Sequence, residues 1–249
     1  MCELSIITVN YNNKAGLEKT INSVVGQTYA GVEYIIIDGG SVDGSVDVIK
    51  EHGDKIKYWV SEKDTGIYNA MNKGIERASG KYCLFLNSGD TLYDKDVTKD
   101  VMGLKSMADI VYGNLIFEYP NGARRKGVMP SKLTFRHMIQ DTLWHPVSFI
   151  KRELFTTIGK YDESFPIISD YDFFLKAVLV AGVSTQKVNI VITLFTQDGV
   201  SASAANKQKI LEERIKVQLK YFSKSQVDEA MKSSTAAKYV KRIKRRLGI

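Results

Sequence analysis

Three short apolar runs in the first 90 residues each end in a polar turn, and this repeated pattern limits the fold more than any other feature of the chain. The runs are Leu4–Asn10, Val32–Asp38 and residues 82–86, and their short length and β-branched or aromatic content predict buried strands. Apolar residues at helical spacing, such as Leu17 and Ile21, follow the first run. Strands that alternate with helices predict right-handed βαβ units. We therefore expect an α/β fold with a mostly parallel sheet flanked by helices.

The polar turns after these runs are expected to lie together, because the carboxyl ends of parallel strands share one edge of the sheet. Ligands of open α/β sheets bind outside that edge. The turn at residues 87–90 (NSGD) carries one carboxylate, Asp90, which is placed to hold a metal ion or a phosphate-bearing substrate. Taken alone, the same residues are common turn formers. Gly39, Gly40 and Gly44 lack the Gly-x-Gly-x-x-Gly spacing and follow the second run, which argues against an NAD or FAD site.

A helix is predicted between the second and third of these runs. Its apolar positions fall on one face, and Gly80 is a natural stop just after it. The residues of that face are Ile67, Ala70, Met71, Gly74, Ile75 and Ala78. Asp64 stands just before the helix, where the helix dipole favours a negative charge. On its own, Asp64 is therefore explained by the helix as well as by a site.

Composition sets the class of protein. With 249 residues and 44% hydrophobic residues, the chain can bury a large core. Residues 232–249 contain seven of the 35 basic residues and none of the 28 acidic ones, so the body is neutral and the tail is basic. The neutral body argues against nucleic-acid binding. Two cysteines, no secretory leader at the first residues and no apolar run of about 18 residues predict a cytoplasmic protein.

Four segments together carry a resemblance that no one of them carries alone. They are residues 5–12 (SIITVNYN), 35–45 (IIIDGGSVDGS), 62–75 (EKDTGIYNAMNKGI) and 85–90 (FLNSGD). Their order resembles the family 2 glycosyltransferases of the GT-A fold, and in particular the bacterial members that build exopolysaccharide, capsule or lipopolysaccharide. The resemblance covers about residues 3–201. It implies a Rossmann-like GT-A domain over residues 1–202, followed by a C-terminal helical extension over residues 203–249.

The resemblance implies a nucleotide-sugar donor, a UDP-, GDP- or dTDP-sugar, bound at the strand ends. The matching donor-binding positions are Thr8, Val9, Asn10, Tyr11, Asp38, Asp64, Asn69, Asn87 and Ser88. It also implies a Mg²⁺ or Mn²⁺ ion held by Asp90, because these ions prefer oxygen ligands. Relatives usually carry Asp-x-Asp there, whereas this chain has Asn87 and then a single acid. Nucleotide and water are therefore expected to supply most of the other ligands.

The catalytic base implied by the resemblance is Asp170, in residues 167–175 (IISDYDFFL), and the reaction implied is an inverting direct displacement. An alternative is that Asp170 caps the helix that follows, and the two roles are compatible. Trp144 and His145, in residues 144–149 (WHPVSF), match a segment near the acceptor or the diphosphate. His145 is equally well explained as a core histidine. Residues 195–201 (FTQDGVS) resemble a loop that closes over the donor.

Two other functions share some of these sequence features. A sugar-phosphate nucleotidyltransferase needs a glycine-rich basic loop after the first strand, where this chain has only Lys14 as a basic residue. A catalytically impaired carbohydrate-binding relative is compatible with the reduced metal motif, but Asp90 and Asp170 favour an enzyme. The expected acceptor is a hydroxyl of a glycan or of a lipid-linked molecule.

The tail contains a predicted basic amphipathic helix over residues 236–247. Ala236, Val240, Ile243 and Leu247 recur at helical spacing, and basic residues cover the other faces. Such a helix can lie on an anionic leaflet, which predicts peripheral contact with the inner face of the cytoplasmic membrane. A terminal helix that packs on the body or is solvated explains the same pattern.

Overall fold

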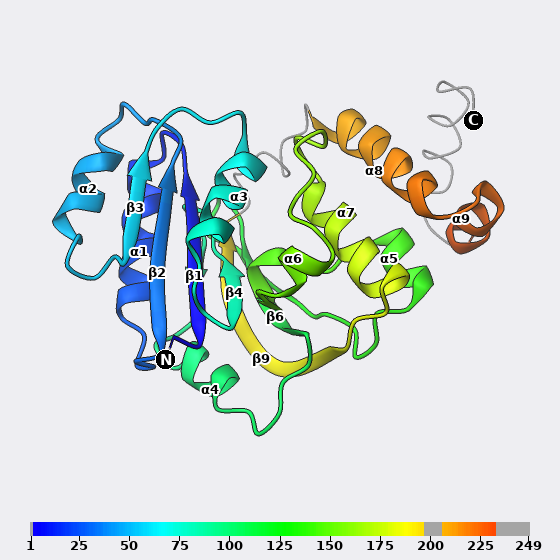
Figure 1. The fold of residues 1–249 in the computed structure, drawn as a ribbon, viewed down its shortest axis with the longest axis horizontal. Helices are drawn as coiled ribbons and strands as arrows, with labels where there is room; N and C mark the ends of the chain where they lie inside the picture. The colour runs from blue at the N-terminus through cyan, green and yellow to red at the C-terminus, as the bar shows by residue number, and fades with distance from the viewer. Residues whose placement is uncertain (1, 197–205, 233–249) are drawn as a thin grey trace.

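The structure is a computed structural model that describes residues 2–196 and 206–232. Within these residues nine strands form one sheet, in the order β3-β2-β1-β4-β8-β6-β9-β5, with β7 paired to β6 (Figure 1). The strands are β1 (Leu4–Asn10), β2 (Val32–Asp38), β3 (Tyr58–Ser61), β4 (Tyr82–Phe85), β5 (Thr91–Leu92), β6 (Ile110–Glu118), β7 (Arg124–Gly127), β8 (Ser148–Lys151) and β9 (Thr185–Thr196).

Helices flank the sheet on both faces, as the alternating pattern predicts. They are α1 (Lys14–Val25), α2 (Ser45–Glu51), α3 (Ile67–Arg77), α4 (Val97–Met102), α5 (Phe135–Gln140), α6 (Leu154–Thr157), α7 (Ser169–Leu175), α8 (Lys207–Tyr221) and α9 (Lys224–Met231), with a 3₁₀ turn at His145–Val147 and a π-helical turn at Lys176–Val180. Helix α3 packs closely on β1 and β2, because Gly74 faces Ile7 where a Cβ atom would lie 2.4 Å from the isoleucine side chain.

The parallel part of the sheet is the part that the strand-helix alternation predicts. Strand β1 pairs in parallel with β2 and β4, and β3 pairs in parallel with β2. In this register Asn10 lies opposite Asp38, so both strands end at the same edge. The predicted α/β fold with a sheet flanked by helices is therefore confirmed.

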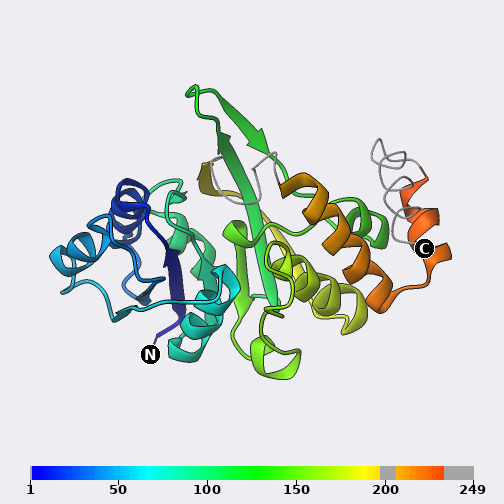
Figure 2. The ribbon, with the colours of Figure 1, turned by 90° about the horizontal axis from the view of Figure 1, so that it is seen from above.

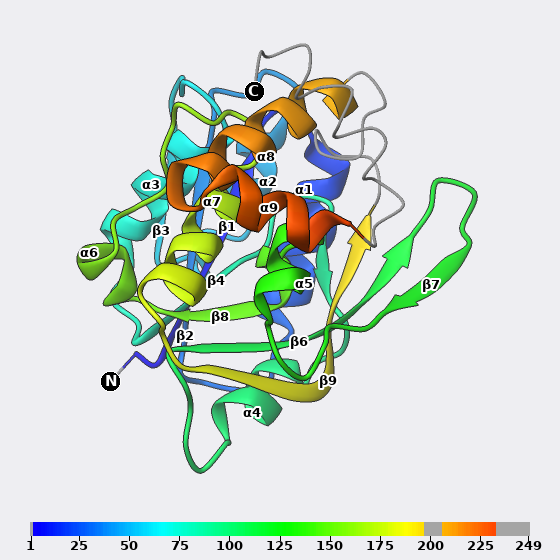
Figure 3. The ribbon, with the colours of Figure 1, turned by 90° about the vertical axis from the view of Figure 1, so that its right-hand side faces the viewer.

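Beyond β4 the sheet is mixed. Strands β8 and β6 pair antiparallel, and β9 runs parallel to β6. Strands β6 and β7 form a hairpin that projects from the body of the molecule (Figures 2 and 3). The long strand β9 curves under this half and returns toward the turn that contains Asp90, where it pairs with β5.

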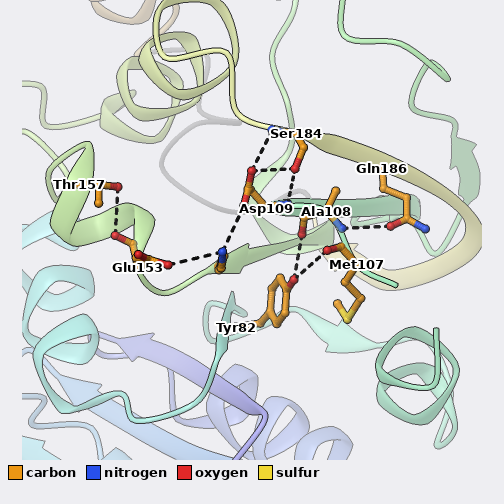
Figure 4. Close-up of polar contacts among 9 residues, drawn as sticks. Tyr82, Met107, Ala108, Asp109, Glu153, Thr157, Ser184 and Gln186 are labelled. Atoms are coloured by element: carbon orange, nitrogen blue, oxygen red, sulfur yellow. Dashed lines mark hydrogen bonds and ion pairs between the residues drawn. The ribbon is translucent and has the colours of Figure 1, made fainter. Parts of the chain in front are cut away.

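A polar cluster fastens this mixed half at the end of the sheet away from the predicted site (Figure 4). The Asp109 carboxylate accepts hydrogen bonds from the Ser184 hydroxyl (2.7 Å) and amide (3.0 Å) and contacts the Lys151 amine at 3.5 Å. The Tyr82 hydroxyl donates to the Ala108 carbonyl at 2.9 Å. The starts of β4, β6 and β9 and the end of β8 are thereby tied together.

The C-terminal helices α8 and α9 pack on α5 and α7 around a second apolar core (Figure 3). This core includes Ile139, Tyr171, Leu175, Ile215, Val217, Val227 and Met231. The end of the predicted domain at residue 202, the loop at residues 197–201 and the amphipathic helix at residues 236–247 lie outside the described residues. Among the residues that are described, no helix has both the length and the apolar character needed to cross a membrane.

Candidate active site

The turn after β4 lies against the end of β1 and the start of α1. The Ser88 amide donates to the Val9 carbonyl at 3.1 Å, and the Asn13 side chain donates to the Ser88 carbonyl at 3.1 Å. Gly89 takes a positive φ of 106°, and its amide donates to the Thr20 hydroxyl at 3.0 Å. The strand ends that the sequence predicts to converge therefore meet at one edge.

Asp38 organises this edge from inside the protein. Its carboxylate is fully buried and accepts hydrogen bonds from the Asn10 amide (2.7 Å), the Gly40 amide (3.2 Å), the Ser41 amide (2.9 Å) and hydroxyl (2.6 Å), and the Ser61 hydroxyl (2.6 Å). Burial on its own raises the pKa of Asp38, but these donors outweigh it and hold the pKa below its usual value. The carboxylate thus joins the ends of β1, β2 and β3, and its contacts are with its own chain.

Two other predicted donor-binding side chains also lie inside the sheet. Thr8 is fully buried with its hydroxyl 3.0 Å from that of Tyr34, and Val9 is a core residue. By contrast, the amide oxygens of Asn10 and Asn87 are buried without a hydrogen-bond partner among the described residues. In the described part of the chain, both oxygens are therefore unpaired acceptors that the protein encloses at this edge.

Tyr11 and Asp64 flank Gly39 on the outer side of the edge. The Tyr11 side chain is 67% exposed. A Cβ atom on Gly39 would lie 2.6 Å from the Asp64 carboxylate and 3.2 Å from the Tyr11 ring, so a larger residue at position 39 would displace them. An open aromatic face beside a carboxylate can stack on a planar base and accept hydrogen bonds from a ribose or base.

Asn69 is held by a residue that the sequence did not indicate. Its amide donates to the Glu163 carboxylate at 3.1 Å, and Glu163 also accepts from Asn72 (3.0 Å) and Thr65 (3.3 Å). Glu163 therefore ties α3 to the loop before α7. More than 90 residues separate it from its partners, and no local pattern marks a contact of this kind.

Asp90 lies deep in the turn and is 5% exposed. One of its carboxylate oxygens accepts from the Thr196 amide at 3.1 Å, which ties the turn to the end of β9. No group of three or more His, Cys, Asp or Glu residues that would suit a metal ion occurs in the described part of the chain. One hard carboxylate is the kind of donor that Mg²⁺ and Mn²⁺ accept, so these residues fit an ion shared with the phosphates of a ligand rather than one held by the protein alone.

Asp170 faces two side chains from other parts of the chain. The Tyr68 hydroxyl, on α3, lies 2.7 Å from Oδ1, and Nδ1 of His145 lies 3.1 Å from Oδ2. The other ring nitrogen of His145, Nε2, lies 3.3 Å from the amide nitrogen of Asn87. The side chains of His145 and Asp170 are 17% and 16% exposed. One continuous polar chain thus joins the turn after β4 to α7.

The electrostatics of this cluster keep Asp170 ionised. Burial on its own raises the pKa of Asp170, but the hydrogen bonds from His145 and Tyr68 outweigh it, so the pKa lies below its usual value. The residue at the N-cap of α7 is Ile168, and Asp170 lies in the first turn. The interpretation of Asp170 as the helix cap is therefore wrong, because its carboxylate points to His145 and Tyr68.

Trp144 packs beside this cluster at the base of the β6–β7 hairpin. Its ring meets Phe117 edge-on, with the centroids 5.5 Å apart, and Phe117 meets Phe195 in the same way at 6.0 Å. Trp144 thereby connects the hairpin to the 3₁₀ turn that carries His145. The structure brings both predicted residues of this segment to the edge, His145 in polar contact and Trp144 in apolar contact.

Comparisons with known proteins agree with this architecture. The family model described as "Glycosyl transferase family 2" matches residues 5–164. An uncharacterized glycosyltransferase of Mycobacterium tuberculosis is 34% identical over 203 residues, which cover 80% of this chain and 77% of that protein. A PGL/p-HBAD biosynthesis glycosyltransferase of Mycobacterium bovis is 29% identical over 201 residues, which cover 78% of this chain and 77% of that protein.

Solved structures share the fold at low identity. TarS of S. aureus (residues 1–349), in complex with UDP-GlcNAc, matches with a TM-score of 0.69 and 18% identity over 92% of this chain and 70% of that one. In a longer TarS structure the match spans 42% of the TarS chain. A mannosyltransferase of Pyrobaculum calidifontis, in complex with GDP-Man and Mn²⁺, matches with a TM-score of 0.67 and 14% identity over 92% of this chain and 69% of that one. The chain has the fold of these glycosyltransferases, and it belongs to glycosyl transferase family 2.

Proposed function

We propose that this chain is an inverting glycosyltransferase that moves a sugar from a nucleotide-sugar donor to a hydroxyl of a glycan or lipid-linked acceptor. The observation that carries the proposal is the Asp170 carboxylate, which the protein keeps ionised, 16% exposed and in one polar chain with the strand-end turn. A general base needs such a carboxylate within reach of the hydroxyl that it deprotonates.

The donor is assigned to the outer side of the strand ends. The Tyr11 ring stacks on the base, and the Asp64 carboxylate accepts hydrogen bonds from the nucleoside. Asn10 and Asn87 are assigned to the same edge, where Asn10 donates to Asp38 and Asn87 contacts His145. Asp38 acts indirectly, because it holds the loop after β2 in place.

The chemical step is a direct displacement. The acceptor hydroxyl gives its proton to Asp170 while its oxygen forms a bond to the anomeric carbon. The bond from that carbon to the diphosphate breaks on the opposite face, and the nucleoside diphosphate leaves with the electron pair. A Mg²⁺ or Mn²⁺ ion bound at Asp90 would neutralise charge on the diphosphate. Asn69, Glu163 and Tyr68 keep α3 and the loop before α7 at a fixed separation, so that donor and base stay aligned.

A panel of UDP, GDP, dTDP and their sugars, with and without Mn²⁺, tests the donor assignment by thermal shift. A ligand that binds only the native state at 100 times its Kd stabilises it by about 2.7 kcal/mol. We expect one nucleotide and its sugar to raise the unfolding temperature. Absence of stabilisation by every member, in a sample that unfolds cooperatively, would contradict the donor site.

Replacing Asp90 with Ala tests the metal assignment. We expect the variant to fold and to lose the part of donor affinity that depends on Mn²⁺, because the described turn offers one carboxylate. Calorimetry with and without Mn²⁺ measures that part directly. Asp47→Ala, at an exposed carboxylate on α2, is the control. If the donor affinity of Asp90→Ala depends on Mn²⁺ as strongly as that of the wild type, Asp90 does not bind the metal ion.

We assign the activity to cell-surface polysaccharide synthesis in the cytoplasm, at the inner face of the membrane. The basic residues of the tail support contact with anionic lipid, at about 1 kcal/mol of attraction for each one near the surface. The full chain is expected to sediment with vesicles that contain anionic lipid at low salt and to be released at high salt. A chain that ends at Ser233 should stay in the supernatant. If it sediments as much as the full chain does, the tail does not cause membrane binding.

A further inference from the structure

Asp170 is held by two side chains to which neither the family match nor the relatives assign a role. Its two carboxylate oxygens each have a partner, and the partners come from different elements. Tyr68 approaches from α3 at 2.7 Å, and His145 approaches from the 3₁₀ turn before β8 at 3.1 Å. An ionised carboxylate has about four lone-pair sites. Two contacts therefore fix its orientation and leave acceptor capacity for a substrate hydroxyl.

The proton on His145 can be placed from its second contact. Nε2 of the ring faces the amide nitrogen of Asn87 at 3.3 Å, and an amide nitrogen only donates. This contact is a hydrogen bond when Nε2 carries the lone pair. In that tautomer the proton of the neutral ring is on Nδ1, where it is donated to the Asp170 carboxylate.

The Tyr68 hydroxyl has a second neighbour that fixes its place. It lies 2.8 Å from the Ile167 carbonyl as well as 2.7 Å from Asp170. The ring is almost fully buried and packs against Tyr161, with the centroids 5.5 Å apart. The hydroxyl is therefore held at one position in the loop before α7, and Asp170 lies against it.

We propose that His145 and Tyr68 are positioning residues that orient the base Asp170, and that Asn87 fixes the tautomer of His145 that does so. This inference rests on the proposed function, since it assumes that Asp170 is the base. It also gives Asn87 a role beyond donor contact. The turn that receives the donor sets the proton arrangement next to the base.

Two substitutions at His145 separate its two contacts. Asn places its amide near the position of Nδ1, and Gln places its amide near that of Nε2. His145→Asn keeps a donor for Asp170, whereas His145→Gln keeps only the contact with Asn87. Loss of a partner that orients a metal ligand typically lowers activity by about 10–100-fold, and an orienting partner of the base is expected to matter to a similar degree. We expect that loss in kcat for His145→Gln, partial recovery in His145→Asn, and an unchanged donor Kd in both.

Tyr68→Phe removes the other contact, and Tyr161→Phe is its matched control. The Tyr161 hydroxyl is buried in the same aromatic cluster and has no hydrogen-bond partner among the described residues. We expect kcat to fall in Tyr68→Phe and to stay near the wild-type value in Tyr161→Phe. Equal losses in the two variants would show that Tyr68 acts only through packing.

The pH profile distinguishes positioning from packing. The ionisable side chains that contact Asp170 are Tyr68 on α3 and His145 on the 3₁₀ turn, and Tyr161, in the loop before α7, interacts with its charge without a hydrogen bond. Burial raises the pKa of Asp170, and the donors lower it. Without a donor, the pH below which kcat falls is therefore expected to move upward in His145→Gln and Tyr68→Phe. An unmoved acid limb in both would overturn the proposal.

A spectroscopic measurement tests the tautomer without any assay of activity. The chain has three histidines, so nitrogen NMR of labelled protein can assign His145 by its loss in His145→Asn. We expect the neutral ring to carry its proton on Nδ1. A neutral ring with its proton on Nε2 would overturn the role of Asn87. If the wild type transfers no sugar from any donor, the proposed function fails while this result still decides the tautomer.

Discussion

Replacing Asp170 with Asn is expected to lower kcat by about 10²–10⁴-fold, the usual loss when a general base is removed. Asn keeps the size of the side chain and an acceptor for Tyr68, but it cannot take the proton of the acceptor hydroxyl. Because the donor is assigned to the strand ends, its Kd should change little. Steady-state transfer and donor calorimetry on the same sample measure the two quantities.

Asp172→Asn is the matched control for this experiment. Asp172 lies two residues along α7, is 6% exposed, and accepts from Lys220 (3.2 Å) and Tyr221 (3.0 Å) on α8. Removal of the Asp172 charge should lower the unfolding temperature, because Lys220 keeps only its contact with Asp162, while the folded variant keeps its kcat. A large loss of kcat in Asp172→Asn with full activity in Asp170→Asn would exchange the roles assigned to these carboxylates.

Replacing Asp38 with Ala is expected to have the largest effect on stability. The substitution removes the acceptor for hydrogen bonds from Asn10, Gly40, Ser41 and Ser61, in a place that is fully buried. A buried group left without a partner costs about 1–3 kcal/mol, so we expect a total loss of roughly 3 kcal/mol or more. Urea unfolding at neutral pH measures it.

The same carboxylate gives a pH signature. Burial raises the pKa of Asp38, its donors outweigh that effect, and the folded-state pKa lies below the usual value. Its contribution to stability is therefore complete above the usual carboxyl range and is lost as the pH falls toward the folded-state pKa. Asp38→Asn should lose this part of the acid dependence. An Asp38→Ala protein as stable as the wild type at neutral pH would show that Asp38 does not organise the edge.

The parallel half of the fold and the position of the site follow from local patterns. The runs that end at Asn10, Asp38 and residue 86 each have the length and composition of a buried strand, and a parallel sheet brings their ends together. The mixed half of the sheet is harder to predict from local sequence patterns. Strand β9 runs for 12 residues and crosses to β5, and its pairing depends on contacts that the local pattern does not contain.

The side chains that contact the proposed base Asp170 could not be predicted from local sequence patterns either. In the sequence, Tyr68 is simply one residue of a predicted helix. It lies 102 residues before Asp170, so no local pattern indicates their contact. Glu163 has no sequence signal at all, although it holds Asn69 and Asn72. Asp38 illustrates the reverse case. Its position at a strand end is predictable, but only the structure shows that its carboxylate is bound by its own chain.

The most direct test of the account is a crystal structure of the protein with its nucleotide-sugar donor. We expect the nucleotide base to stack on Tyr11, the diphosphate to lie beside Asp90, and the anomeric carbon to face Asp170 with room between them for one hydroxyl group. A donor bound with its sugar turned away from Asp170, or bound away from the ends of β1, β2 and β4, would contradict it.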